Sequence, residues 1–262
     1  MTDSVLYNVD SAVATVTINR PAARNALTAE AKADLLAALQ GASTDPEVRA
    51  VVLTGSSGAF CSGQDLREHA ELLDAGAAVA LDTVRTHYNP IIEAIAFMPK
   101  PVVAALPGVA AGAGAGLAFA CDFRIAAQRA TLLLAFARVG LGPDSGTSWT
   151  LQRLVGPAKA AELLMLAEPV DAPTALGLGL LTSVVPDDEL PTAAARLAAK
   201  LAAGPTLAYA AIKEGLIFAA AHGLRDALDK EAELQRRLGD TTDHQAATRA
   251  FVARQEPTYR GR

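Results

Sequence analysis

Apolar and polar residues follow two different periods in the first part of the chain. In Val13–Asn19 apolar and polar residues alternate, and together with Val5–Val9 and the turn residues Asp10-Ser11 this pattern predicts a β-hairpin. From Thr28 to Gln40 the leucines recur at helical spacing, which predicts a helix capped by Thr28. Two further runs are apolar throughout and indicate buried strands: Arg49–Thr54 and Pro101–Leu106.

The segment between these two strands has no clear period at first. Residues 67–88 are rich in polar side chains and regular spacing starts only at Val79, so we expect a mobile segment that leads into a helix from Val79 to Met98. Pro90 is expected to kink that helix. The later pattern predicts strands at Phe123–Ala126 and Leu181–Val185, and helices at Leu117–Cys121, Trp149–Val155, Pro157–Leu166 and Asp171–Gly177.

The last third of the chain has helical spacing throughout. The expected helices are Pro191–Ala203, Thr206–Ala221, Leu224–Leu238 and Asp243–Ala253. Strands and helices alternate before this point and strands are absent after it, which predicts an α/β core over residues 1–189 and a helical region over residues 190–262. The apolar faces of the late helices favour a role in oligomerisation.

Glycines, which have no side chain, are frequent between the strand that ends at Leu106 and the helix that begins at Leu117. Four glycines stand there, namely Gly108, Gly112, Gly114 and Gly116. Glycines let a chain turn sharply and let another molecule approach its amides. A strand that passes through such a turn into a helix directs free N–H groups and the positive helix end at one point, so the stretch predicts a site for an anion or a developing oxyanion.

A second strand-to-turn passage, from Gly55 to Leu66, supplies another set of free amides. Other interpretations of the glycine stretch fit less well. Pro107 and the glycines would leave backbone groups unsatisfied in lipid, although Val102–Cys121 carries no charge. The third position of a dinucleotide-binding fingerprint falls on Leu117. Close packing of a strand against a helix accounts for one or two of the four glycines.

Composition narrows the class of protein. The chain has 262 residues, 51% of them hydrophobic, which suffices for a large core and a subunit interface. A net charge of −5 argues against a nucleic-acid surface. The two cysteines, Cys61 and Cys121, and the four scattered histidines show no metal-binding spacing, so we expect no metal ion. No secretory signal is visible, so a reducing cytoplasm is the expected location.

Several short motifs occur together in a fixed order. They are Asn19-Arg-Pro, Arg24-Asn-Ala-Leu27, Phe60-Cys-Ser-Gly-Gln-Asp-Leu66, Lys100-Pro-Val-Val-Ala, Gly108-Val-Ala-Ala-Gly-Ala-Gly-Ala and Cys121-Asp122. In this order and spacing the chain resembles the crotonase (enoyl-CoA hydratase/isomerase) superfamily over essentially its whole length. Two later stretches, Phe136–Gly146 and Phe251–Gly261, are similar to the branch that contains 1,2-epoxyphenylacetyl-CoA isomerase.

The resemblance implies a spiral of ββα units and a C-terminal helical region that forms trimers or dimers of trimers. It also implies an oxyanion hole of two backbone amides, which map onto Ser62 and Ala113, for the carbonyl of an acyl-CoA thioester. The family usually has Ala at the first position and often Gly at the second, and both changes are compatible with a backbone donor. Preorganised donors of this kind stabilise the negative charge that builds when a proton is removed beside a thioester.

The same resemblance implies where coenzyme A binds. Adenine and phosphate contacts are expected from Arg24, Ala26 and the edge Gly63-Gln64-Asp65-Leu66. Asp65 could equally cap the turn or helix that follows it, and Arg24 could be a solvated surface charge. Coenzyme A enters as part of the substrate, and no separate cofactor is expected.

The usual catalytic acids are missing. A syn hydratase of this family uses two carboxyl groups, one as base and one as acid, and those positions align with Gly116 and Phe136. Asp144 stands where the epoxide-isomerase branch carries its acid, and one carboxylate suffices for a double-bond shift or an epoxide isomerisation through an enolate. Alternatively, Asp144 caps a helix that begins near Ser145.

The sequence therefore favours an acyl-CoA isomerase with Asp144, Ser62 and Ala113 as its catalytic groups. A hydratase of altered mechanism and a catalytically silent acyl-CoA-binding protein are the alternatives. An acyl-CoA thioester is the expected partner, and neither a nucleic acid nor a membrane is. RNA binding, known for some relatives, does not suit the charge of the chain.

Overall fold

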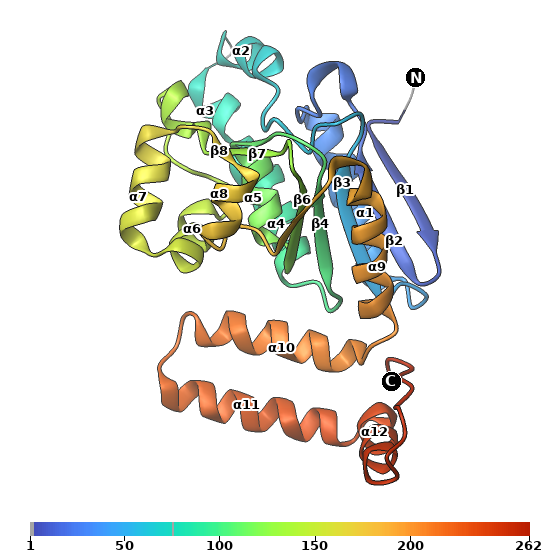
Figure 1. Ribbon diagram of the computed structural model, residues 1–262. Coiled ribbons are helices and arrows are strands. Elements are labelled where there is room, and N and C mark those ends of the chain that lie inside the picture. The colour runs from blue at the N-terminus through green and yellow to red at the C-terminus, as the bar shows by residue number, and fades with distance from the viewer. Residues whose placement is uncertain (1–2, 75) are drawn as a thin grey trace.

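The computed structural model describes residues 3–74 and 76–262. Its main sheet has the strand order β1-β2-β3-β4-β6-β9 (Figure 1). The strands are β1 (Val5–Asp10), β2 (Val13–Ile18), β3 (Ala50–Gly55), β4 (Val102–Leu106), β6 (Phe123–Ala127) and β9 (Ser183–Val185). The first pair is antiparallel and every later pair is parallel, so the chain runs through strand–helix–strand units after the opening hairpin.

The opening hairpin confirms the alternating pattern of the sequence. Val5 pairs with Ile18 and Asp10 with Val13, as a two-residue turn requires. Ala14, Val16 and Ile18 of β2 are fully buried, whereas β1 lies at the sheet edge with most residues exposed. Strands β3 and β4 are buried along nearly their whole length, which is why their sequences are apolar throughout.

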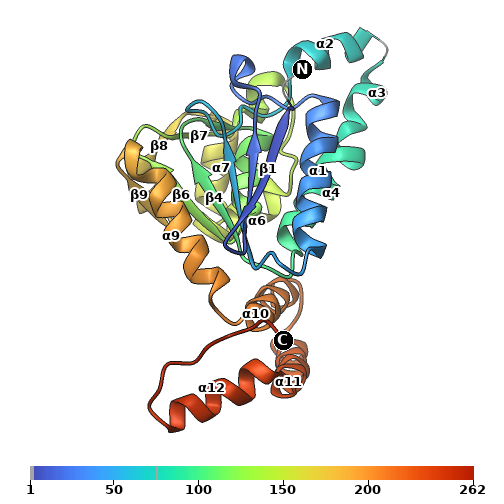
Figure 2. The ribbon, with the colours of Figure 1, turned by 90° about the vertical axis from the view of Figure 1, so that its right-hand side faces the viewer.

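Helices cover both faces of the main sheet. Figure 2 shows α1 (Ala29–Thr44) and α4 (Asn89–Ala96) on one side and α9 (Leu190–Ala202) on the other. Thr28 caps α1 as predicted, with its hydroxyl accepting from the Ala31 amide. The α1 side holds the larger part of the core, and α9 closes a smaller cluster over β3, β4 and β6.

The segment after β3 differs from the expectation. The structure forms α2 (Leu66–Asp74) where the sequence predicted a mobile stretch, then α3 (Ala77–Leu81) and a π-helical turn (Val84–Tyr88) before α4. Residue 75 lies outside the described residues. Helix α2 has no buried residue, although Leu66, Ala70 and Leu73 recur at helical spacing, a signal that the prediction of a mobile stretch did not use. Pro90 sits in the first turn of α4, where its missing N–H is tolerated.

A smaller sheet stands beside the main one, with the order β5-β7-β8. Its strands are β5 (Ala110–Ala111), β7 (Thr131–Leu133) and β8 (Val170–Asp171). Around it lie α5 (Ala113–Ala120), α6 (Thr147–Val155), α7 (Pro157–Leu166) and α8 (Ala172–Gly177). Three short 3₁₀ turns complete the core at Pro21–Ala23, Ala135–Val139 and Asp187–Glu189.

The remaining helices are set below the sheet layers in Figure 1. They are α10 (Thr206–Ala219), α11 (Leu224–Gly239) and α12 (Thr242–Val252). Because α9 packs on the sheet, the division between core and helical region falls after α9 rather than after residue 189. Buried Lys213 of α10 ties this region to the core through an ion pair of 2.8 Å with Asp122. No described helix is both long and apolar enough to span a membrane.

The glycine stretch packs more tightly than the sequence suggested. A Cβ atom at Gly108 would lie 2.0 Å from the Gly58 carbonyl oxygen, and one at Gly114 would lie 2.2 Å from the Cys61 carbonyl oxygen. Gly112 instead needs glycine for its φ of +51°. Close packing also holds at Gly116, so it explains three of the four glycines rather than one or two.

Two glycine-to-alanine variants are expected to change stability in opposite directions. Gly108→Ala forces a Cβ onto a backbone carbonyl and should lower the free energy of unfolding by roughly 3 kcal/mol. Gly41→Ala, inside α1 with no atom within 4 Å of the added Cβ, should raise it by about 0.5–1 kcal/mol. Denaturant unfolding measures both, and equal effects of the two changes would contradict the packing described for Gly108.

Candidate active site

Two glycine-rich turns, distant in sequence, lie side by side in the fold. Cys61 forms a parallel bridge with Ala110, and the Cys61 carbonyl accepts from the Ala111 amide at 2.9 Å. The two segments therefore run in the same direction and turn at the same place, the first at Gly63 and the second at Gly112. A Cβ at Gly63 would lie only 3.4 Å from the Ala113 nitrogen, so the two turns are in contact.

The amide of Ala113 is a free donor. Ala113 is the first residue of α5, and its N–H has no acceptor among the described residues. Gly112 before it donates its own N–H to the Leu133 carbonyl at 2.8 Å, which fixes the turn. The positive end of the helix dipole adds to the attraction for a negative oxygen at this position.

The amide of Ser62 is already occupied. Its N–H donates to the Arg24 carbonyl at 3.1 Å, and its hydroxyl donates to the Ala23 carbonyl at 3.2 Å. The prediction that Ser62 supplies the second donor of an oxyanion hole is therefore wrong for this geometry.

The next free amide along the turn belongs to Gln64. The Gly63 carbonyl accepts from the Leu27 amide at 2.8 Å. A trans peptide directs its C=O and N–H to opposite sides, so the Gln64 N–H points away from Leu27. Among the described residues it has no acceptor. The pair of free amides at the two turns is therefore Gln64 and Ala113.

A cavity of about 500 Å³ opens in front of these amides. Most of its wall is apolar, from α2, α3 and the 3₁₀ turn at Ala135–Val139. Its polar lining residues are Ser62, Gln64, His69, Thr83, Tyr88 and Asp144. Asp144 is the one carboxylate among the described residues that line the cavity. An acyl group could therefore lie in apolar surroundings with a single acid beside it.

Asp144 does not cap a helix. Helix α6 begins at Thr147 with Gly146 at the cap position, and no side chain caps it. The Asp144 carboxylate instead accepts from the Ser145 hydroxyl at 2.8 Å. Ser145 fits because Gly116 has no side chain, since a Cβ there would lie 2.6 Å from the Ser145 Cβ. Because Gly116 has no side chain, it leaves room for Ser145, which holds the Asp144 carboxylate.

Burial tunes the ionisable groups of the cavity. It raises the pKa of Asp144 above the ordinary aspartate value, while the Ser145 hydroxyl and the Lys32 ammonium act in the opposite direction. A carboxylate with a raised pKa is a stronger base. Burial also raises the pKa of Cys61 to about 12, so its thiol stays protonated and is no nucleophile.

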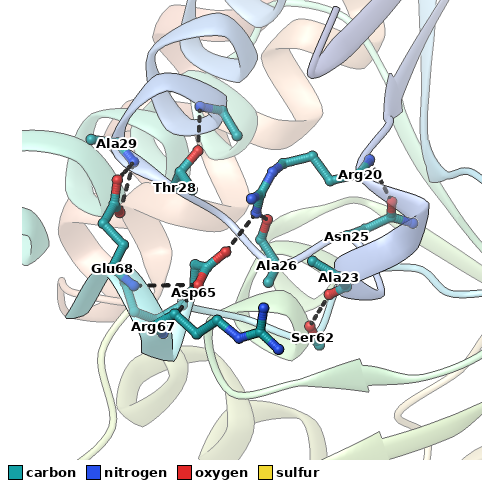
Figure 3. A network of polar contacts seen from close by, with 12 residues as sticks. Arg20, Ala23, Asn25, Ala26, Thr28, Ala29, Ser62, Asp65, Arg67 and Glu68 are labelled. Atoms are coloured by element: carbon teal, nitrogen blue, oxygen red, sulfur yellow. Dashed lines mark hydrogen bonds and ion pairs between the residues drawn. The ribbon is translucent and has the colours of Figure 1, made fainter. Parts of the chain in front are cut away.

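The edge expected to contact coenzyme A is held by a network of polar contacts, shown in Figure 3. Asp65 forms an ion pair of 2.9 Å with Arg20 and accepts from the Arg67 amide at 3.1 Å. Glu68 accepts from the Ala29 amide at 3.0 Å and so joins α2 to the start of α1. Asp65 is therefore a cap and an ion-pair partner, the alternative that the sequence left open.

The structure divides the predicted site residues into two groups. Ser62, Gly63, Gln64, Leu66, Ala113 and Asp144 line the cavity. Arg24, Ala26 and Asp65 lie outside its lining. Arg24 is exposed, and the amide and carbonyl of Ala26 are already paired with Ala23 and Arg20. Their contact with coenzyme A stays a prediction.

The chain matches the family model described as enoyl-CoA hydratase/isomerase over residues 8–262. The chain belongs to this family. A relative from Rhodobacter capsulatus named "Probable enoyl-CoA hydratase" is 42% identical, with 99% of this chain and 98% of that protein covered. The 1,2-epoxyphenylacetyl-CoA isomerase of Escherichia coli is 37% identical over the full length of both chains. The crystal structure of a protein from Mycobacterium abscessus named "putative Enoyl-CoA hydratase/isomerase" has a TM-score of 0.94 at 45% identity, with 98% of this chain and 100% of that chain covered.

These similarities confirm the crotonase fold for this member of the enoyl-CoA hydratase/isomerase family. They include both hydratases and isomerases, so the site itself must distinguish the reactions. At the two positions where the family resemblance implies the acids of a hydratase, the structure has buried Gly116 and Phe136, and the latter lines the cavity. Neither side chain can accept or donate a proton.

Sequence reasoning missed a polar cluster behind the Gln64 side chain. Lys32 is buried and donates to the Gln64 side-chain oxygen at 3.0 Å, and the Tyr88 hydroxyl donates to the same oxygen at 2.8 Å. Lys32 recurs with Leu35 and Leu39 at helical spacing, so the sequence itself indicated that this lysine lies on the buried face of α1. Within residues 3–74 and 76–262 no three His, Cys, Asp or Glu side chains are grouped to hold a metal ion.

Proposed function

We propose that this protein is an acyl-CoA isomerase that works through an enolate held by the amides of Gln64 and Ala113. The observation that carries the proposal is that Asp144 is the one carboxylate among the described residues of the cavity lining. A reaction that needs two carboxyl groups, one as acid and one as base, lacks one of them here. A reaction in which one group removes a proton and returns it needs no other carboxylate.

The proposed reaction begins when Asp144 accepts a proton from a carbon of the acyl chain conjugated with the thioester. The electrons of the broken C–H bond move onto the thioester carbonyl oxygen, and the Gln64 and Ala113 amides stabilise that charge. Protonated Asp144 then returns the proton to a different carbon, so the double bond shifts and the carboxylate of Asp144 is restored. For an epoxide, the electrons of the enolate would expel the epoxide oxygen as the C–O bond breaks, and protonated Asp144 would give its proton to the alkoxide that forms.

The substrate is proposed to bring coenzyme A as part of itself, with no separate cofactor. Arg24 is exposed beside Ser62, whose amide it holds, and could meet a phosphate of the bound ester. The exposed apolar residues of the last three helices, Ile212, Leu216, Leu224, Leu228, Phe251 and Val252, support a homotrimer or a dimer of trimers. The net charge of −5 supports no role in nucleic-acid binding.

A product analysis tests the proposal against its alternatives. Cis-3-enoyl, trans-2-enoyl and epoxyphenylacetyl thioesters of coenzyme A are incubated with the enzyme, and the products are identified by mass spectrometry. A product that has the mass of the substrate but separates from it by chromatography is an isomer and supports the proposal. A 3-hydroxyacyl-CoA would indicate a hydratase of altered mechanism, and the absence of proton exchange at C2 and C4 in deuterated water would indicate a binding protein.

The activity is expected to rise with pH through the pKa of Asp144. The base works only as a carboxylate, and burial raises the pKa of Asp144, so the acid limb of kcat/KM should lie above the ordinary aspartate range. Rates are measured from pH 4 upward, roughly the start of the aspartate range, with circular dichroism at each pH as a control for acid unfolding. A flat profile over the range where the protein stays folded would exclude Asp144 as the base.

A further inference from the structure

Lys32 is a buried cation that forms no ion pair with a described residue. It lies on the buried face of α1 and is 1% exposed, and among the described residues no carboxylate lies within ion-pair distance of its Nζ. Removing an ammonium from water costs several kcal/mol unless other contacts compensate. Its Nζ donates to the Gln64 Oε1 at 3.0 Å and to the Thr83 hydroxyl at 2.5 Å, and it lies 4.9 Å from the centre of the Tyr88 ring.

These contacts fix the side chain of Gln64. Its Oε1 accepts from two donors, the Lys32 ammonium and the Tyr88 hydroxyl, so the opposite amide orientation would place an NH₂ group against both. The Nε2 has no partner among the described residues, which leaves the oxygen to anchor the side chain. Because the backbone N–H of the same residue is the free amide at the cavity, anchoring the side chain also holds that donor in position.

The charges around Lys32 come from three other elements. Burial lowers the pKa of Lys32, although the carboxylates of Glu68 on α2 and of Asp144 on its loop act in the opposite direction. Glu68 is engaged with the start of α1. His87, within 3.2 Å of the Thr83 hydroxyl, has a pKa lowered by burial and by Lys32, although Glu68 and Asp82 oppose this, and it is neutral at pH 7.

The phenol of Tyr88 is also neutral, because burial raises its pKa well above 10. Within this cluster the Lys32 ammonium is therefore the positive charge that acts on Asp144. During the proposed reaction the negative charge moves from Asp144 to the thioester oxygen beside Gln64. The Lys32 ammonium, fixed behind Gln64, favours negative charge both on Asp144 and on the thioester oxygen.

We propose that Lys32 is a positioning residue of the active site, which holds the oxyanion donor of Gln64 in place and favours negative charge in the cavity through its ammonium. The inference rests on the proposed enolate chemistry. It assigns to α1, a helix with no residue in the cavity lining, a direct influence on the reaction.

Two variants of Lys32 separate anchoring from charge. Lys32→Met removes both and should lower kcat by roughly 10- to 100-fold with little change in KM, and should move the acid limb of the pH profile to higher pH. Lys32→Gln keeps a donor for the Gln64 oxygen without the charge, so it should recover part of kcat and keep the shifted limb.

Lys100→Met is the matched control. Lys100 is also buried, 7% exposed, and its Nζ donates to the Ala42 and Asp45 carbonyls at 2.6 Å each, away from the cavity lining. Its loss should reduce stability and leave kcat and the pH profile unchanged. A similar loss of kcat in Lys100→Met and Lys32→Met would show a merely structural effect and overturn the proposal.

A vibrational measurement separates this inference from the proposed function. The carbonyl stretch of a ¹³C-labelled butanoyl-CoA shifts to lower frequency when two amides polarise it, whether or not turnover follows. Lys32→Met should lose part of this shift, and Asp144→Asn should keep it. If the protein is not an isomerase, the frequency shift still measures whether Lys32 holds the Gln64 amide in place. A Lys32→Met variant with the native shift would overturn the inference.

Discussion

Replacing Asp144 with Asn is expected to lower kcat for isomerisation by about 10³-fold or more. The asparagine amide matches the carboxylate in size and can still accept from the Ser145 hydroxyl, but it cannot take up a proton. Binding of an acyl-CoA ester should remain within a few-fold, because the cavity wall and the two free amides are unchanged. Steady-state rates and calorimetric titration with a non-reactive ester measure the two effects.

The same variant has a second expected effect, on stability. The pKa of Asp144 is raised in the folded protein, so its carboxylate is less stable there than in the unfolded chain. This cost is present at pH values above the folded-state pKa and vanishes below the unfolded-state pKa. Asp144→Asn should therefore unfold at higher denaturant concentration than the native protein at pH 7, but not at pH 3. Retained turnover, or a loss of stability at pH 7, would contradict the role given to Asp144.

Ala113→Pro is expected to lower kcat/KM by about 10²–10³-fold, equivalent to roughly 2.7–4 kcal/mol of transition-state stabilisation. Proline has no N–H, so the change removes one of the two donors without altering any titrating group. Ala113 is the first residue of α5, where proline is well tolerated, and the fold should be retained.

Ala113→Gly serves as the matched control because it keeps the N–H at the same position. It should keep most of the activity and lose about 1 kcal/mol of stability or less. Near-ultraviolet circular dichroism checks that both variants fold. If Ala113→Pro folds and turns over at the rate of Ala113→Gly, the Ala113 amide is not an oxyanion donor.

Much of the scaffold was predictable because its residues carry strong local signals. The hairpin, the apolar strands β3 and β4 and the late helices were all read from periodicity and turn residues. Helix α2 was missed although Leu66, Ala70 and Leu73 recur at helical spacing, because the segment is short and otherwise rich in polar residues. The boundary at residue 189 was misplaced because α9 and α10 have similar helical spacing, and only packing shows that α9 covers the sheet.

The site was predictable in its position but not in its hydrogen bonds. The two turns and Asp144 do meet at one cavity, as the glycines and the single acid indicated. Whether Ser62 or Gln64 presents a free amide depends on the pairing of Gly63 with Leu27, a long-range contact that no local motif encodes. The packing of Gly116 against Ser145 is of the same kind, and it links α5 to the residue that holds the Asp144 carboxylate.

In the proposed reaction one carboxylate, that of Asp144, isomerises an acyl-CoA without the addition of water. The most direct measurement is mass spectrometry of the product formed from a trans-2-enoyl-CoA in ²H₂¹⁸O. We expect a double-bond isomer without ¹⁸O, which carries deuterium at C2 or C4 where the proton on Asp144 exchanges with solvent before its return, and no such product with Asp144→Asn. A 3-hydroxyacyl-CoA that contains ¹⁸O as the main product would contradict it.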